Sequence, residues 1–281
     1  MSNSAQAVKD KLKVIAKNKN IDFNFVLRFY MYDRFIERLS RSKYRDNFIL
    51  KGGFYLSHLF GINNRSTMDI DAAIRNVEFS SENIVKMITE IIEIDVDDKT
   101  KFKIEKIESI RDEDEYGGIR VTIGFLLENI RDIFHVDIAT GDPIYPGPIN
   151  YSYQSLIGTD IYRVWSYNLE TVIVEKIESI LSKLESSSRM KDYYDIYLIC
   201  KFKLDSIDEK DLRMAAEKTF KKRCFSDDMF FDLSFIKESQ ILRTRWASYA
   251  RKNNYAKDID FEECLDCLET LIKIISDMKE E

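Results

Sequence analysis

Two aspartates separated by a single residue, Asp69 and Asp71, have the chemistry and spacing of a cation-binding pair. They lie in a segment of alternating polarity, residues 68–74, which predicts a β-strand with both carboxylates on one face. Carboxylates bind hard divalent cations such as Mg²⁺, which promote phosphoryl and nucleotidyl transfer. Isolated pairs of this kind are also common on surface strands, so the pair alone is weak evidence for a site.

A second segment, residues 133–139, is built in the same way. Its apolar residues alternate with His135 and Asp137, so that these two polar side chains share the opposite face. A carboxylate on a largely apolar strand is costly unless its charge is compensated, and three carboxylates brought together repel one another. A divalent cation would remove both costs. The sequence therefore predicts a metal site formed by Asp69, Asp71 and Asp137, with Mg²⁺ or Mn²⁺ as the cation.

The triplet Lys51-Gly52-Gly53 lies between a short predicted strand, residues 48–50, and a short helix that ends near Leu59. Two glycines let the backbone approach a phosphate closely, and the start of the helix offers unpaired N–H groups. The spacing is not that of a P-loop. A Gly-Gly turn without further context is usually only a turn.

Lys176 lies within the apolar stripe of a helix predicted over residues 169–185. A lysine in such a stripe either extends its ammonium group to the surface or faces a cleft, where it could hold phosphate oxygens. Glu175 and Glu178 flank the stripe, and we expect both at the surface.

The next predicted helix, residues 189–202, carries two oppositely charged pairs at helical spacing: Arg189 with Asp192, and Lys191 with Asp195. Pairs at this spacing can be ordinary surface ion pairs that stabilise a helix by a few tenths of a kcal/mol, about 0.2–0.5. The tyrosines of this helix are expected in the core, with base stacking on one of them as the alternative.

The remaining pattern predicts a mixed α/β half followed by a helical half. The amino-terminal half has helices at residues 4–17, 22–40 and 82–94, and further strands at 102–110 and 119–127. After Asn168 the pattern is helical, with segments at 169–185, 189–202, 208–221, 227–252 (with a break) and 260–279. All three prolines lie between residues 143 and 148, so we place a domain boundary at residue 150, giving domains 1–150 and 151–281.

The composition is that of a globular chain without a secretory or membrane-spanning segment. The 281 residues are 44% hydrophobic, 12% aromatic and 33% charged, with 9 Gly and 3 Pro. No apolar run reaches membrane-spanning length, and the four cysteines are scattered, so we expect a cytoplasmic protein. Cys264 and Cys267 have the spacing of half a zinc site, but no second ligand pair accompanies them, which favours two helical, half-buried thiols.

The net charge of −6 conceals an asymmetry along the chain. Residues 90–115 contain 11 acidic and 5 basic side chains, a balance of −6, whereas residues 212–257 contain 11 basic and 5 acidic, a balance of +6. A basic region is compatible with a polyanionic partner, although a charge run is more often simply a solvated face.

Several of these motifs, in this order, resemble those of one protein family. Gly52-Gly53, a helix, and then the run from Arg65 through Asp69 to Asp71 resemble the first motif of polymerase-β-like nucleotidyltransferases. The greatest similarity is to the AbiEii/AbiGii toxins of abortive-infection, type IV toxin–antitoxin systems. The segments around Lys176 and residues 189–198 resemble that family's later motifs, so the likeness runs from about residue 48 to 200.

The resemblance implies an α+β fold: a polymerase-β-like nucleotidyltransferase domain, with a mixed sheet flanked by helices, followed by an all-helical carboxy-terminal domain that completes the nucleotide site and contacts RNA. It implies a toxin that uses Mg²⁺ to transfer nucleotides from a nucleoside triphosphate to RNA, with the tRNA 3′ acceptor end as target, blocking translation and growth. A separately encoded antitoxin and a role against phage infection are implied as well. No membrane partner is expected.

The resemblance also assigns roles to residues. Asp69, Asp71, Asp137, Lys176 and Asp192 are implied as catalytic. The residues implied in nucleotide binding are Lys51, Gly52, Gly53, Arg65, Ser66, Lys176, Arg189, Lys191 and Asp195. The division of labour between Asp192 and Asp195 stays open.

One departure from the general superfamily pattern concerns the glycine motif. That pattern has Gly-Ser closer to the aspartates, whereas here 15 residues separate Gly53 from Asp69. In that pattern the serine hydroxyl contacts the triphosphate. Ser66 and Arg65 are the candidates to make this contact here. Two other functions are compatible with the residues: transfer to a small molecule or protein side chain, and a non-catalytic nucleotide- or RNA-binding regulator.

Overall fold

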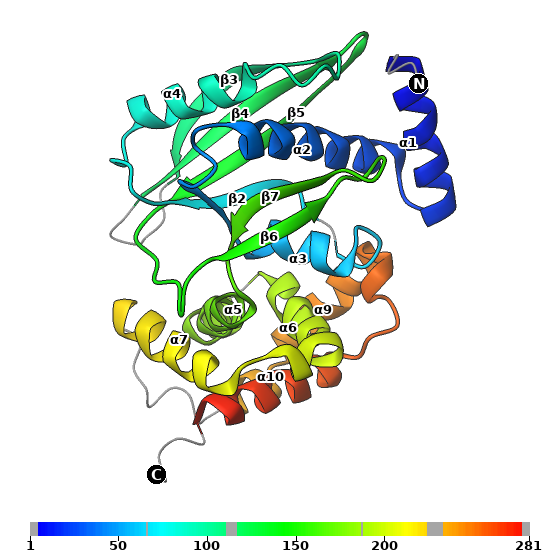
Figure 1. Cartoon of the computed structure of the whole chain (residues 1–281). Helices are drawn as coiled ribbons and strands as arrows, with labels where there is room; N and C mark the ends of the chain where they lie inside the picture. Colours follow the sequence, from blue (N-terminus) through cyan, green and yellow to red (C-terminus); the bar gives the residue numbers. More distant parts are fainter. Residues whose placement is uncertain (1–4, 66, 111–116, 187, 224–232, 277–281) are drawn as a thin grey trace. The chain divides into compact units, whose positions relative to one another are not determined.

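Seven strands pair into one mixed sheet in the computed structural model, which describes residues 5–65, 67–110, 117–186, 188–223 and 233–276 (Figure 1). The strand order is β3-β4-β5-β2-β1-β7-β6; β2 pairs with β5, and β1 with β7, in parallel, and the other neighbours are antiparallel. The strands are β1 (Phe48–Leu50), β2 (Asp69–Ile74), β3 (Thr100–Ile110), β4 (Gly118–Leu127), β5 (Ile130–Ala139), β6 (Ile149–Gln154) and β7 (Ile161–Ser166).

The chain divides into two units. Unit 1 comprises Met1–Gly141 and Ile149–Ser166, and unit 2 comprises Asp142–Pro148 and Tyr167–Glu281. The helices of unit 1 are α1 (Ala5–Lys19), α2 (Phe23–Arg41), α3 (Gly52–Phe60) and α4 (Ser81–Ile92). Those of unit 2 are α5 (Leu169–Lys183), α6 (Met190–Lys203), α7 (Glu209–Lys222), α8 (Ser234–Lys237), α9 (Gln240–Lys252) and α10 (Phe261–Ser276). Short 3-10 turns follow α5, α6 and α9, at Leu184–Ser186, Leu204–Ser206 and Asn254–Ala256.

The core of unit 1 lies on one face of the sheet, under α2 and α4 (Figure 1). Alternate residues of the central strands, such as Ile70, Val121 and Val136, are fully buried there. The alternation that predicted the strands thus places their apolar side chains under the helices and their polar side chains on the opposite face.

The α+β class with a mixed sheet, flanking helices and a helical carboxy-terminal region is confirmed. Two strands were not predicted: β6 and β7, which follow the prolines and extend the sheet. Consequently the division differs from the predicted boundary at residue 150, because β7 pairs with β1, β6 pairs with β7, and residues 149–166 belong to unit 1. The β1 partner of β7 is far away in sequence, so local periodicity did not reveal that these strands join the sheet.

In unit 2, α5 packs against α6 and α7, and α10 packs against α6 and α7. The predicted helices agree with these elements, including a break before α9; residues 224–232 lie outside the described part of the chain. The predicted core tyrosines Tyr193 and Tyr194 are fully buried. Over the residues that the structure describes, no helix is both long and apolar enough to cross a membrane.

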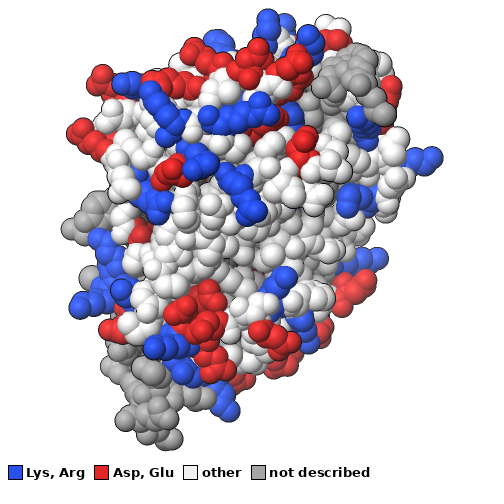
Figure 2. Space-filling model, viewed as in Figure 1, with Lys and Arg blue, Asp and Glu red and all other residues white. Residues whose placement is uncertain are grey.

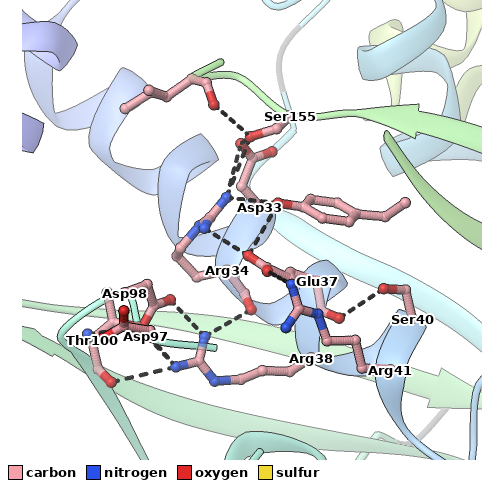
Figure 3. A network of polar contacts seen from close by, with 12 residues as sticks. Asp33, Arg34, Glu37, Arg38, Ser40, Arg41, Asp97, Asp98, Thr100 and Ser155 are labelled. Atoms are coloured by element: carbon pink, nitrogen blue, oxygen red, sulfur yellow. Dashed lines mark hydrogen bonds and ion pairs between the residues drawn. The ribbon is translucent and has the colours of Figure 1, made fainter. Parts of the chain in front are cut away.

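A buried polar network ties α2 to the sheet of unit 1 (Figure 3). Asp33 is fully buried and accepts hydrogen bonds from the Tyr153 hydroxyl at 2.6 Å, the Ser155 hydroxyl at 2.8 Å and the Leu156 backbone N–H. On the next turn Arg38 donates two hydrogen bonds to Asp98, at 2.7 and 2.9 Å. The network therefore fixes α2 to β6 and to the start of β3.

Replacing Asp33 by alanine should lower the free energy of unfolding by about 3 kcal/mol or more, because three buried donors would lose their acceptor. Denaturant unfolding of the purified variant measures this. The control is Asp10→Ala, which removes an exposed carboxylate of α1. A change in the Asp33 variant as small as in the control would contradict the role assigned to the network.

Candidate active site

The predicted carboxylates lie side by side on the face of the sheet opposite the core. Asp69 and Asp71 alternate with buried Ile70 on β2, and the parallel register aligns Asp71 with Asp137 of β5 and Asp69 with His135. The strand register thus places on one face of the sheet the three aspartates that the sequence predicts as metal ligands. Adjacent strands are about 4.8 Å apart, so the facing side chains are neighbours.

A third strand adds a cation that the sequence analysis missed. Arg120 of β4 aligns with Asp137 and donates to both of its carboxylate oxygens, Nε to Oδ1 at 2.7 Å and Nη2 to Oδ2 at 2.6 Å. Its Nη2 also lies 3.9 Å from Asp69 Oδ2. These hydrogen bonds raise the pKa of Arg120 further above its ordinary value, so the guanidinium stays charged. The alternation of β4 placed Arg120 on the polar face, but only the strand register shows its partner.

His135 of β5 lies on the same polar face, in register with Asp69. Its Nδ1 lies 2.9 Å from Asp69 Oδ1, within hydrogen-bonding distance. The carboxylate of Asp69 is therefore positioned from a neighbouring strand, as metal-binding carboxylates usually are.

The glycine motif lies directly against Asp71. Gly52 and Gly53 open α3 after Lys51, whose backbone N–H donates to the Asp71 carbonyl at 2.8 Å. A Cβ built on Gly53 would stand 2.9 Å from Asp71 Oδ2 and 3.7 Å from the Arg65 guanidinium. Arg65 is almost completely buried. The start of a helix, whose first N–H groups have no acceptor within the helix itself, thus lies beside the carboxylate pair, which is an arrangement suited to a phosphate next to a cation.

Gly53→Ala is expected to reduce catalysis about a hundredfold with little loss of stability, because a methyl group would displace the Asp71 carboxylate while α3 gains in helix propensity. Turnover and thermal unfolding are measured on the same preparation. Gly147→Ala is the matched control, since a Cβ there would meet no atom within 4 Å. Full activity of the Gly53 variant would show that close approach to Asp71 is not needed.

The donor set of this face suits a hard divalent cation. Asp69 and Asp71 supply carboxylate oxygens from one side of one strand, and Asp137 supplies a third pair. The two Asp137 oxygens are held by Arg120, however, and in the part of the chain that the structure describes no group of three or more His, Cys, Asp or Glu side chains is gathered as a metal cage. The residues fit Mg²⁺ in kind, with Asp137 engaged by an arginine.

The later motifs form a second cluster, inside unit 2. Lys176 of α5 is buried, and its Nζ lies 2.9 Å from Asp192 Oδ1 and 2.6 Å from Asp195 Oδ2. Arg189 reaches Asp192 from the start of α6, with Nε 3.3 Å from Oδ2, and Ser179 donates to the same oxygen. The ammonium group is therefore held between two carboxylates, so both Asp192 and Asp195 position Lys176.

The pairing predicted from helical spacing is correct for Arg189 and Asp192. Lys191 is exposed on α6, and Asp195 is buried with its Oδ2 2.6 Å from Lys176 Nζ. Glu178, expected at the surface, is buried and paired with Arg223, because α7 packs along that side of α5. Ser66 lies outside the described residues. Cys264 and Cys267 are buried in α10.

The Asp192 carboxylate makes the stability of unit 2 sensitive to acid. Burial acts to raise its pKa, but the charges of Lys176 and Arg189 outweigh this effect, so the pKa lies below the ordinary value. A carboxylate with a depressed folded-state pKa stabilises the fold above its unfolded pKa, about 3.9, and this contribution disappears as the pH falls through the folded value. The stability advantage of the wild type over Asp192→Asn should therefore be full at pH 6 and shrink below about pH 4.

Urea unfolding at a series of pH values measures that advantage. Asp266→Asn, an exposed position on α10, is the control and should show no such loss. A difference between wild type and Asp192→Asn that stays constant down to pH 3 would contradict the ion-pair assignment.

A cavity of about 510 Å³ in unit 1 is separate from the carboxylate face. It is lined by Lys9, Arg28, Arg131 and Asp132, with apolar neighbours from α2 and β5. Asp132 and buried Phe134 are two residues apart on β5, so their side chains point to the same side of the sheet. Asp132 therefore lies on the core side of β5, opposite to Asp137. This cavity is therefore not part of the candidate site.

The family model "Nucleotidyl transferase AbiEii toxin, Type IV TA system" matches residues 34–267, from α2 to α10. The chain belongs to the AbiEii family. The resemblance found in the motifs is thereby confirmed, and the match includes both the carboxylate strands and the Lys176 cluster. A search of curated proteins finds no match.

Among solved structures, JHP933 from Helicobacter pylori is similar to this AbiEii-family chain over 90% of this chain and 91% of its own, with 14% identity and a TM-score of 0.53. A candidate nucleotidyltransferase from H. pylori matches over 91% and 96%, with 14% identity and a TM-score of 0.49. At such identities the first likeness concerns the fold alone.

Proposed function

We propose that this AbiEii-family chain is a divalent-cation-dependent nucleotidyltransferase that adds nucleotides from a nucleoside triphosphate to RNA, with the tRNA 3′ end as acceptor. The observation that supports this most is the juxtaposition of Asp69 and Asp71 with Asp137 on one face of the sheet, beside the glycine-initiated start of α3. The family supplies the nucleotidyltransferase class and an antitoxin partner. The cation, the acceptor and the block of translation are part of the proposal.

The residues of unit 1 would have three roles: binding the cation, positioning phosphate oxygens and placing the loop before β2. Asp69 and Asp71, with Asp137, would hold Mg²⁺, which when bound polarises the phosphoryl group and neutralises developing charge. The N–H groups at the start of α3 would position phosphate oxygens near Asp71. Arg65 would help to place the loop before β2, in keeping with its burial next to Gly53.

We assign Lys176 to phosphate binding, as a fixed point charge, and Asp192 and Asp195 to positioning its ammonium group. Their two contacts, at 2.9 and 2.6 Å, restrict the lysine side chain to one geometry. Arg189, half exposed on the same cluster, would add a second phosphate contact.

The choice of RNA as acceptor rests on basic residues of unit 2. Exposed lysines and arginines lie in the last turns of α7 and α9: Lys221 and Lys222 on the first helix, Arg251 and Lys252 on the second. Cationic side chains that reach phosphates dominate the affinity for RNA. The face seen in Figure 2 mixes basic with acidic side chains.

The test is incubation of the purified chain with Mg²⁺, total tRNA and each labelled nucleoside triphosphate in turn. We expect label at the tRNA 3′ end, removed by nuclease and absent when EDTA replaces Mg²⁺. Label that survives nuclease would point to a protein or small-molecule acceptor instead. Binding of nucleotide without any transfer, from any triphosphate, would favour a regulator.

A further inference from the structure

Arg120 forms a two-point ion pair with Asp137 on the carboxylate face. The pairing is bidentate, with distances of 2.7 and 2.6 Å, and the guanidinium also faces Asp69 at 3.9 Å. Side-chain exposures of 37% for Arg120 and 18% for Asp137 show that the pair is partly open to water. Two-point pairing of arginine with a carboxylate is the geometry in which a partly exposed ion pair becomes strong and specific.

The strand register explains why this arginine is there. Arg120, Asp137 and Asp71 are aligned across β4, β5 and β2, so that the arginine ends a row whose other two members are acidic. Without a cation three carboxylates on one face would repel one another. Arg120 supplies one positive charge within hydrogen-bonding range and so lowers that repulsion.

The same contact opposes cation binding. A guanidinium that donates to both oxygens of Asp137 occupies lone pairs that a metal ion would use, and its positive charge repels an incoming divalent ion. For Asp137 to bind a cation together with Asp69 and Asp71, Arg120 has to release at least one of the two oxygens.

We propose that Arg120 is a built-in counterion that holds Asp137 in the cation-free enzyme and is displaced when a divalent cation binds, so that Arg120 sets the cation affinity of the site. This inference rests on the cation-dependent function proposed above. It makes Arg120 a positioning residue whose removal tightens cation binding while weakening the cation-free fold.

The experiment measures Mn²⁺ binding directly, without substrate, by titration of the purified chain followed by electron paramagnetic resonance. Arg120→Met should bind Mn²⁺ about tenfold more tightly or better, because one repelling charge is lost. Arg120→Lys keeps the charge but lacks the two-point geometry, so its affinity should fall between those of wild type and Arg120→Met. Arg131→Met, which removes an exposed arginine of β5 away from the aspartates, should bind as the wild type does.

Thermal unfolding supplies an independent readout. Arg120→Met should unfold at a lower temperature than wild type in EDTA and gain more from added Mn²⁺, whereas Arg131→Met should show neither change. Equal Mn²⁺ affinity in wild type and Arg120→Met, or weaker binding in the variant, would overturn the inference. It would not contradict the proposed transfer reaction, which the tRNA-labelling assay tests. Absence of Mn²⁺ binding in every protein would contradict the proposed cation dependence, and the inference with it.

Discussion

Replacing Asp71 by asparagine is expected to reduce nucleotidyl transfer about a thousandfold or more while the chain stays folded. A metal-binding carboxylate contributes several kcal/mol of transition-state stabilisation, and each 1.36 kcal/mol corresponds to about a factor of ten in rate. Asparagine has nearly the same shape, so the packing against Gly53 is retained. Incorporation of labelled nucleotide into tRNA measures the loss, and circular dichroism reports the fold.

The matched control is Asp132→Asn. Asp132 is on the same sheet, but its side chain points to the core side of β5 and not to the carboxylate face. It should transfer nucleotides at nearly the wild-type rate, and only the Asp71 variant should lose its toxicity when expressed without antitoxin. An Asp71→Asn protein that remains fully active and toxic would exclude this face of the sheet as the catalytic site.

Replacing Lys176 by methionine should both abolish transfer and lower the free energy of unfolding by about 3–5 kcal/mol. The loss of stability follows because Asp192 and Asp195, both buried, would be left without the cation between them. Denaturant unfolding measures the stability, and incorporation of labelled nucleotide measures the activity. Lys183→Met, an exposed position on the same helix, should change neither.

Loss of stability by itself could account for loss of activity, and a combined variant separates the two. Converting Asp192 and Asp195 to asparagine in the Lys176→Met background removes the unpaired charges, so most of the lost stability should return. Transfer should stay absent if Lys176 acts on phosphate. Recovery of activity together with stability would show that the lysine is only structural.

Much of the candidate site could be predicted from local sequence patterns. The alternation of β2 places Asp69 and Asp71 on one face, because successive side chains of any strand point to opposite sides. The apolar stripe of α5 likewise shows that Lys176 is an exception on a buried surface. Ordered motifs identified the family, which the match over residues 34–267 confirms.

Other features depend on segments that are distant in sequence. The strands β6 and β7 escaped prediction because β7 gains stability from pairing with β1, about a hundred residues earlier in the chain, and β6 from pairing with β7. The burial of Glu178 depends on α7, whose Arg223 pairs with it. Neither neighbour leaves a signal in the local periodicity.

The carboxylate pair itself was determined by the sequence, since the two-residue period of a strand is a property of the backbone. Its surroundings were decided by the tertiary structure. Parallel pairing of β2 with β5 set Asp71 opposite Asp137, and antiparallel pairing of β4 with β5 set Arg120 against that same carboxylate. Strand order and register follow from burying the apolar face of the whole sheet beneath its helices, so they cannot be derived from any single strand.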